Sequence, residues 1–253
     1  MTKKQIIVKS DKSIWVHVAI LSMGSTRMEQ TQWSNVTMKE MRSRQGYNIT
    51  VSYSMATPVM NNRAKIVKQF RAMGADWLMM LDEDCVPHAN PFDLIELDYD
   101  IIGFPAPIQR GVSSPGDPII WNVELIDDEG NWVSECLPVG GEPIEVAAIG
   151  TGGILIARRV LEAMPAPFVE PVDKFGERVV GGDIFFCRRA RKLGFKVWAA
   201  PSMALSHIKP TDLYTVWELL HPGATKLEPT MDKFGPWDLE GWGGEDEDSS
   251  NPK

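Results

Sequence analysis

The sequence lacks the long apolar runs that mark membrane and secreted proteins. None of its apolar stretches, over 253 residues, approaches the roughly 18–20 residues that a membrane-spanning helix needs. The first residues, MTKKQIIVKSDKSIW, carry lysines but no apolar segment of about 7–15 residues followed by a small-residue cleavage site. We therefore expect a soluble protein that has no membrane partner and works in the cytoplasm.

Cysteine and positive charge are also scarce. The three cysteines, Cys85, Cys136 and Cys187, are an odd number and lie about fifty residues apart. Such a set argues against a disulfide framework and against a zinc knuckle, and it predicts reduced, mostly buried thiols. The net charge of −8 disfavours a surface built to grip nucleic-acid backbone, although it leaves room for a local basic groove.

The apolar residues that are present make up 43% of the chain, enough for one large domain with its own core. The first third alternates between two patterns. Strands are predicted at 4–10, 13–24, 47–55 and 76–84, and helices at 26–46 and 61–74. Asn61 or Asn62 is expected to cap the second helix and Gly74 to end it. This succession predicts an α/β fold with a mainly parallel sheet flanked by helices.

The second half adds an insertion and a further helix. Residues 99–111 read as a strand that enters a loop, and 119–137 as an antiparallel hairpin turning at Asp128–Gly130. Residues 144–167 read as strand, glycine turn, strand and a short helix stopped by Pro165. Next comes a helix at 181–195, with Phe186, Ala190 and Leu193 inward, and then closing strands at 196–208. Periodicity weakens from 211, and the acidic residues 241–253 are expected to be a disordered tail.

Three adjacent carboxylates, Asp82, Glu83 and Asp84, end the apolar run WLMML. In open α/β sheets ligands bind outside the carboxyl ends of the strands. Hard oxygen ligands gathered at one point suit Mg²⁺ or Mn²⁺. A polar turn after a strand explains the same triplet without a metal, because Asp and Asn near Pro are common turn residues.

Three stretches together resemble the GT-A glycosyltransferases, especially family-2-like enzymes. They are NNRAKIVKQFRAMGADWLMMLDEDCVPHANPFDLI, IGTGGILIARRVLEAM and VGGDIFFCRRARKLGFKVWAAPSMALSHIKP. In that family an Arg-bearing helix, a strand ending in an Asp-x-Asp motif, a Gly-rich strand and a helix opened by Glu-Asp occur in this order, before a metal-binding histidine. The resemblance covers roughly 12–210, so it implies a GT-A catalytic domain at 1–210, with a C-terminal extension at 211–240 packing on or near the active site.

The resemblance also implies roles for individual residues. Asp82, Asp84 and His207 correspond to the metal ligands, and Mn²⁺ is favoured over Mg²⁺ because it tolerates imidazole better. Asp183 corresponds to the general base for the acceptor hydroxyl, which implies an inverting reaction. The residues expected to bind the nucleotide sugar are Ser22, Asn62, Arg63, Asp82, Gly152 and Gly153. Gly182 stands where the family usually has a glutamate, so any role of that glutamate is in doubt here.

Taken together, these features predict a transferase that moves a sugar from a nucleotide-diphosphate sugar, expected to be a UDP-sugar, to an acceptor hydroxyl. The acceptor classes left open are a hydroxylated DNA base, a protein and a glycan, as for the stand-alone enzymes of bacteriophages and bacteria. Two rival interpretations remain: a sugar-nucleotidyltransferase, favoured faintly by LSMGSTRMEQ, and a non-catalytic carbohydrate-binding protein on the same fold.

Overall fold

The computed structural model describes residues 13–22, 46–55, 59–109, 119–126, 132–133 and 140–208. The strand predicted at 4–10, the helix at 26–46, the turn at Asp128–Gly130 and all of 211–253 lie outside the described residues. By its internal contacts the chain divides into two units, Met1–Pro210 and Thr211–Lys253. Every described residue belongs to the first unit.

Among the helices that the structure describes, none is long and apolar enough to cross a membrane.

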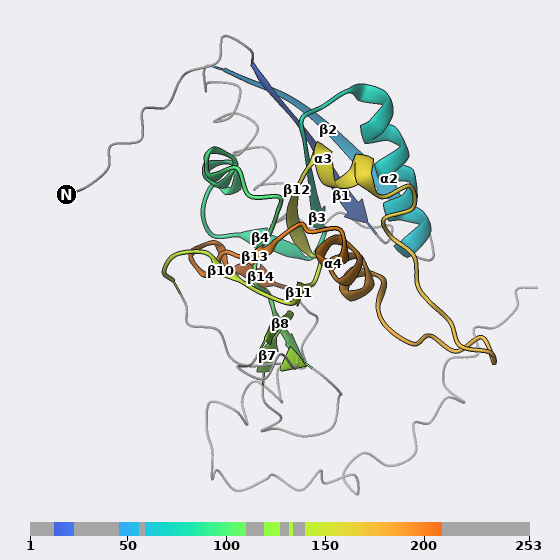
Figure 1. The fold of residues 1–253 in the computed structure, drawn as a ribbon. Helices are drawn as coiled ribbons and strands as arrows, with labels where there is room; N and C mark the ends of the chain where they lie inside the picture. Colours follow the sequence, from blue (N-terminus) through green and yellow to red (C-terminus); the bar gives the residue numbers. More distant parts are fainter. Residues whose placement is uncertain are drawn as a thin grey trace, which may run out of the picture. The chain divides into compact units, whose positions relative to one another are not determined.

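The core of the first unit is a seven-stranded sheet with the order β10-β13-β5-β12-β3-β1-β2 (Figure 1). Its strands are β1 (Ile14–Ser22), β2 (Tyr47–Met55), β3 (Trp77–Asp82), β5 (Ile101–Gly103), β10 (Ile144–Glu145), β12 (Gly153–Ala157) and β13 (Val197–Ala199). β1 is parallel to β2 and β3, and β5 to β13, whereas β12 and β10 run against their neighbours. Five of the seven strands thus point the same way, which confirms the predicted α/β class with a mainly parallel sheet.

The central strands are apolar throughout because both faces of the sheet are covered. In β3 all residues from Trp77 to Leu81 are buried, and so is the whole of β12. A strand buried on both faces has no polar side to alternate with, which explains the continuous apolar run in the sequence. The first polar residue of this run, Asp82, comes where β3 leaves the core.

Helix α2 (Val59–Met73) packs against β1 and β2. It begins earlier than predicted, so neither Asn61 nor Asn62 is its N-cap. Asn62 points inward instead, where its Nδ2 donates a hydrogen bond of 2.9 Å to the carbonyl of Ser54 at the end of β2. Gly74 ends the helix as predicted, with a positive φ of 77° that disfavours any side chain.

Two further helices cover the sheet. The short α3 (Arg158–Ala163) follows β12 directly, and α4 (Gly182–Lys192) packs against β11 and β13. In α4 Phe186 and Ala190 are buried as predicted, but Leu193 is 53% exposed. The prediction for Leu193 was wrong because the helix ends at Lys192. The chain then turns so that Phe195 packs against the core in its place.

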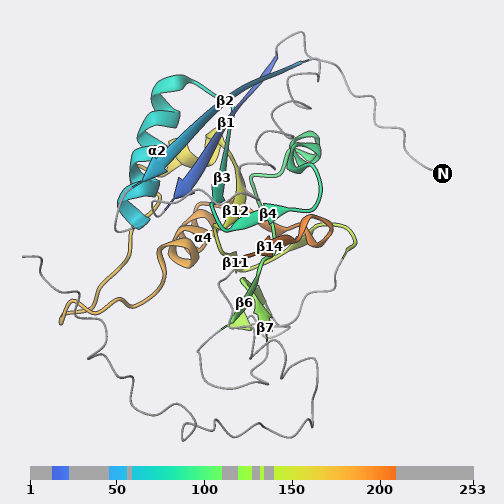
Figure 2. The same ribbon diagram turned by 180° about the vertical axis from the view of Figure 1, so that it is seen from behind.

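Smaller sheets extend the structure beyond the end of β3. Strand β4 (Cys85–Pro87) pairs with β14 (Leu205–His207), and β6 (Pro107–Gln109) pairs with β7 (Ile119–Trp121). The predicted hairpin is present as β8 (Val123–Ile126) and β9 (Trp132–Val133), joined on its other edge by β11 (Ala148–Ile149). Two 3-10 helices, η1 (Pro91–Leu97) and η2 (Pro201–Met203), complete the described elements. Figure 2 shows β4 and β14 side by side beyond the end of β3.

Candidate functional site

The candidate site lies where three strands of the central sheet meet at their ends. β1 and β3 are parallel neighbours, with Leu21 paired to Asp82, so their carboxyl ends share one edge of the sheet. The antiparallel β12 starts at the same edge, and the backbone N–H of Asp82 donates to the carbonyl of Gly152 at 2.9 Å. The glycine turn before β12 is therefore held against the acidic end of β3.

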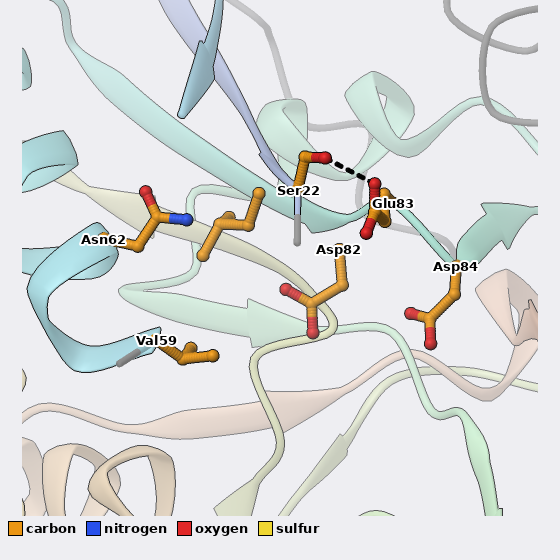
Figure 3. A pocket seen from close by; sticks show the side chains of 7 residues that line it. Ser22, Val59, Asn62, Asp82, Glu83 and Asp84 are labelled. Atoms are coloured by element: carbon orange, nitrogen blue, oxygen red, sulfur yellow. Dashed lines mark hydrogen bonds between the residues drawn. The ribbon is translucent and has the colours of Figure 1, made fainter. Parts of the chain in front are cut away.

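The three adjacent carboxylates do not point the same way. Asp82 and Asp84 direct their carboxylates to one side of the chain, and Glu83 directs its own to the other (Figure 3). Glu83 is buried and accepts a hydrogen bond of 2.5 Å from the hydroxyl of Ser22. The alternation expected of an extended chain thus places the carboxylate of Glu83, bonded to Ser22, on the side opposite those of Asp82 and Asp84.

Asp84 lies next to His207. The Nε2 of His207 is 3.3 Å from Oδ2 of Asp84, while its Nδ1 is 2.8 Å from the carbonyl oxygen of Pro107. A carbonyl oxygen can only accept, so Nδ1 carries the hydrogen of that bond. Nε2 and the carboxylate then face each other as two acceptors, and only a proton or a cation between them makes the contact favourable.

Charged residues from several parts of the chain affect the pKa of Asp82. The pKa of Asp82 is raised to about 6, mainly by burial, and the nearby carboxylates of Asp84 and Asp183 contribute in the same direction. Arg63 and His207 act in the opposite direction. Four ionisable groups, three of them from distant segments of the chain, thus act on one carboxylate. The structure brings together the predicted metal ligands, the predicted base and the predicted donor-binding arginine.

The residues of α2 that face this site are buried and incompletely bonded. Arg63 is 8% exposed, and its Nε bonds to no described residue. Its guanidinium lies 5.9 Å from the centroid of the Phe168 ring, and Nη1 lies 3.7 Å from Sδ of Met60. Asn62 is 2% exposed, and Oδ1 of its amide likewise has no partner in the described part of the chain. Orphaned polar atoms at this depth are costly unless a ligand satisfies them.

A small cavity of about 120 Å³ lies between Asn62 and the two aspartates (Figure 3). Its lining residues are Leu21, Ser22, Val59, Asn62, Asp82, Glu83 and Asp84. The cavity thus spans from the buried amide of Asn62 to the two aspartates. Of the predicted donor-binding residues, Ser22 reaches it from the end of β1, where its hydroxyl is already engaged by Glu83.

The predicted glycines play different parts. A Cβ on Gly152 would lie 3.1 Å from Sγ of Cys85 and 3.6 Å from Oδ2 of Asp82, so Gly152 borders the site. A Cβ on Gly153 would lie 2.7 Å from Leu205 and from Phe104. Core packing alone therefore requires a glycine at position 153.

Asp183 lies in the first turn of α4, but the N-cap is Gly181, which provides no side-chain bond. Oδ1 of Asp183 accepts the backbone N–H of Ile184 at 2.9 Å. Asp183 is therefore not the N-cap, although its carboxylate satisfies one of the first backbone N–H groups of the helix, as a capping side chain does. At Gly182, where the GT-A resemblance leads one to expect a glutamate, a Cβ would meet the side chain of Met60.

Two residues at the site were not singled out from the sequence. Cys85 has its Sγ within 4.8 Å of ligand atoms of both Asp84 and His207, and these three form a group that could hold a metal ion. Asp82 is not part of this tight group. Thr151, in the glycine turn, is 1% exposed, and its hydroxyl has no partner among the described residues. Their positions next to Asp84 and Gly152 in the sequence were the only signal.

The donor set fits a divalent cation. It offers the carboxylates of Asp82 and Asp84 on one side of the chain, and an imidazole whose tautomer is set by the carbonyl of Pro107. A hydrogen bond from the second ring nitrogen to a carbonyl, as here, orients histidine ligands in metal sites.

Comparisons with known proteins give similarity to solved structures alone. No family model matches the chain, and no curated protein does. The crystal structure of A197 from STIV matches with a TM-score of 0.51 at 20% identity, over 78% of this chain and 87% of that one. The structure of GalNAc-T7 with UDP, GalNAc and Mn²⁺ matches at 0.45 and 12% identity, over 79% of this chain and 44% of that one. A UDP-glucose pyrophosphorylase complexed with UDP-glucose matches at 0.43 and 7% identity, over 81% and 97%.

The fold and the site together define a class. The chain has a mixed α/β fold with a mainly parallel central sheet, and this fold is similar to that of A197 from STIV. Near the acidic edge of this sheet, Asn62, Arg63 and Thr151 each have a buried polar atom without a partner among the described residues.

Proposed function

We propose that this chain is a glycosyltransferase that uses a nucleotide-diphosphate sugar, most simply a UDP-sugar, and a divalent cation. The single observation that carries the proposal is the contact of 3.3 Å between Nε2 of His207 and Oδ2 of Asp84, with Nδ1 of His207 bonded to a carbonyl. A proton or a cation makes this contact favourable, and the carboxylate of Asp82 on the same side of the strand end supports a cation.

The donor would lie in the cavity between α2 and the two aspartates. Oδ1 of Asn62 needs a hydrogen-bond donor, which a ribose hydroxyl or the N–H of a uracil base supplies. The buried guanidinium of Arg63 suits a phosphate, which it can bind through two parallel hydrogen bonds. A nucleoside diphosphate carries both kinds of group in one molecule. Thr151, Ser22 and Gly152 would border the same ligand.

Asp82, Asp84 and His207 would hold Mn²⁺, or Mg²⁺. When bound, the cation supplies Lewis-acid stabilisation of the charge that develops on the leaving diphosphate. Imidazole nitrogen favours Mn²⁺ over Mg²⁺, because Mg²⁺ strongly prefers oxygen ligands.

Asp183 would act as the general base that takes the proton from the acceptor hydroxyl. Its position in the first turn of α4 and the action of its charge on Asp82 support this role. Direct attack of the activated hydroxyl on the sugar would invert the anomeric configuration. The acceptor is a hydroxylated DNA base, a protein or a glycan.

A panel of nucleotide sugars tests the proposal without knowledge of the acceptor, because water can replace the acceptor slowly. Full-length protein is incubated with each UDP-, GDP- and CDP-sugar and Mn²⁺, and release of nucleoside diphosphate is measured with and without a chelator. We expect chelator-sensitive release from at least one UDP-sugar. Asp84→Asn should abolish it, whereas Asp93→Asn, at an exposed carboxylate of η1, should not change it.

Two other outcomes would replace this proposal. Formation of a nucleotide sugar from a nucleoside triphosphate and a sugar phosphate, without turnover of any sugar donor, would identify a sugar-nucleotidyltransferase. Binding of sugars without turnover of either kind would identify a carbohydrate-binding protein.

A further inference from the structure

Cys85 lies beside the Asp84–His207 pair, and the proposed function gives it no role. Its Sγ, a carboxylate oxygen of Asp84 and a ring nitrogen of His207 all lie within 4.8 Å of one another. Cys85 itself is 1% exposed. A thiol at this place differs from the buried, inert cysteine that the sequence predicts, because its nearest polar neighbours are themselves candidate metal ligands.

The pairing of β4 with β14 fixes this arrangement. Cys85 and His207 are directly opposite each other in the antiparallel ladder, and side chains that are directly opposite lie on the same face. The backbone N–H of Ile208 donates to the carbonyl of Asp84 at 2.7 Å, which extends the ladder to the aspartate. Two strands of a sheet therefore hold all three side chains.

Two contacts show where the sulfur lies. The thiol of Cys85 donates to Oδ1 of Asp84 at 3.6 Å, so the sulfur is against the carboxylate. It is also 3.1 Å from the place that a Cβ on Gly152 would occupy, and Oδ2 of Asp82 is 3.6 Å from the same place. Because Gly152 has no side chain, nothing of that residue separates the sulfur from Asp82.

We propose that Cys85 is a metal ligand together with Asp84 and His207, and that the site therefore binds thiophilic divalent cations such as Co²⁺, Zn²⁺ and Cd²⁺ more tightly than Mg²⁺. This inference rests on the metal site of the proposed function and deepens it. A mixed oxygen, nitrogen and sulfur donor set departs from the hard, oxygen-rich sites that Mg²⁺ selects. On binding, the S–H bond breaks, the sulfur electron pair goes to the cation and the proton passes to solvent.

Cys187 provides the matched control. It is also fully buried, but its thiol donates to the carbonyl of Ile149 at 3.6 Å, and burial raises its pKa to about 12. It belongs to no metal-ligating group of the described residues. A thiol that is merely buried should therefore behave like Cys187.

The test is titration of the full-length, reduced protein with Co²⁺ or Cd²⁺ alone, followed by ultraviolet absorption. Thiolate ligands produce a sulfur-to-metal charge-transfer band that oxygen and nitrogen ligands do not. We expect the band in the wild type, Cys187→Ser and Cys136→Ser, and its loss in both Cys85→Ser and Cys85→Ala. Competition experiments should give Cys85→Ser a Cd²⁺ affinity lower by at least about tenfold, the loss that even an outer-shell change causes, with Mg²⁺ affinity unchanged.

Each contrary result has a distinct meaning. Persistence of the band in Cys85→Ser overturns the assignment, as does binding of Co²⁺ to the wild type without the band. In the second case the metal site and the proposed function stand, and only the role of Cys85 falls. Absence of any Co²⁺ or Mn²⁺ binding would overturn both. Circular dichroism and thermal unfolding of the two Cys85 variants show whether loss of the band reflects loss of the fold.

Discussion

The side chain of Met60 on α2 occupies the space beside Gly182 at the start of α4. A Cβ at position 182 would collide with the end of Met60, whose Sδ also lies 3.7 Å from Nη1 of Arg63. The absence of a side chain at 182 thus lets a methionine pack between the two helices. It also explains physically why the glutamate of the resembling family has no counterpart here.

This packing predicts a coupled pair of substitutions. Gly182→Ala should lower the free energy of unfolding by about 1–2 kcal/mol, because the added methyl group overpacks the contact with Met60. Met60→Ala in the same chain should remove the clash, so the double variant should be more stable than the sum of the single effects by about 0.5 kcal/mol or more. Urea unfolding of the four proteins measures the coupling. Strict additivity would mean that Met60 moves aside without cost.

A substitution at Thr151 tests whether its hydroxyl lowers the stability of the ligand-free protein and contributes to ligand binding. Its buried hydroxyl has no described partner, so Thr151→Val should raise the free energy of unfolding of the ligand-free protein by about 1 kcal/mol, the lower end of the cost of burying an unsatisfied polar group. Thermal unfolding without ligand measures this. If the hydroxyl touches the donor, the same variant should bind the nucleoside diphosphate more weakly.

The same substitution at a bonded threonine is the control. The hydroxyl of Thr50 accepts from Nε1 of Trp15 at 3.1 Å and lies 2.9 Å from Nδ1 of His17. Thr50→Val should therefore lower the free energy of unfolding by about 1–2 kcal/mol. Equal shifts in the two variants would show that the hydroxyl of Thr151 is satisfied after all.

His17 predicts a dependence of stability on pH. This residue of β1 is fully buried, and the hydroxyls of Thr50 and Ser52 on β2 lie at its two ring nitrogens. Burial lowers its pKa. As the pH falls below about 6.5, the ordinary pKa of histidine, the imidazole of His17 is therefore protonated in the unfolded chain before it is protonated in the folded chain. The contribution of neutral His17 to stability is fully present above that pH and is lost as the pH falls toward the lower pKa of the folded state.

The measurement compares chemical unfolding of the wild type and His17→Gln across this pH range. The difference in free energy between the two proteins should shrink as the pH falls below about 6.5. A difference that stays constant with pH would show that His17 does not titrate differently in the folded and unfolded chains.

The proposed division of labour predicts that Asp183→Asn and Asp84→Asn fail in different ways. Asp183→Asn should bind the nucleoside diphosphate and Mn²⁺ as the wild type does, yet lose transfer by about 10²–10⁴-fold, the usual contribution of a general base. Asp84→Asn should lose metal-dependent binding itself. Calorimetry with UDP and Mn²⁺ separates the two. Equal loss of binding in both variants would contradict separate roles.

Elements with strong local signals could be predicted well from the sequence. The bounds of β2 match the prediction residue for residue, and α2 ends at Gly74 as expected. Both signals are local: a β-branched and aromatic run in one case, and a glycine that adopts a positive φ in the other. The predicted start of α2 was wrong. The side chain of Asn62, which local reasoning assigned to a cap, makes a tertiary hydrogen bond to Ser54 instead.

The candidate site was predictable only in part, for a related reason. Asp82 and Asp84 stand out because charge interrupts an apolar run, and His207 and Asp183 came from the resemblance. Cys85 could not be found in this way, since its closeness to His207 depends on the register between β4 and β14. Local periodicity carries no information on which distant strand a segment pairs with.

The antiparallel β12, inserted between β3 and β5, has a consequence for the order of folding. β1, β2 and β3 are close in sequence and can associate early, but the carbonyl of Gly152 reaches Asp82 only after β12 has crossed into the sheet. β14 comes later still in the chain, and it must pair with β4. Contacts of such long sequence separation form slowly. During refolding, acquisition of cation affinity should therefore lag behind the formation of secondary structure, so that the metal site reports completion of the native topology.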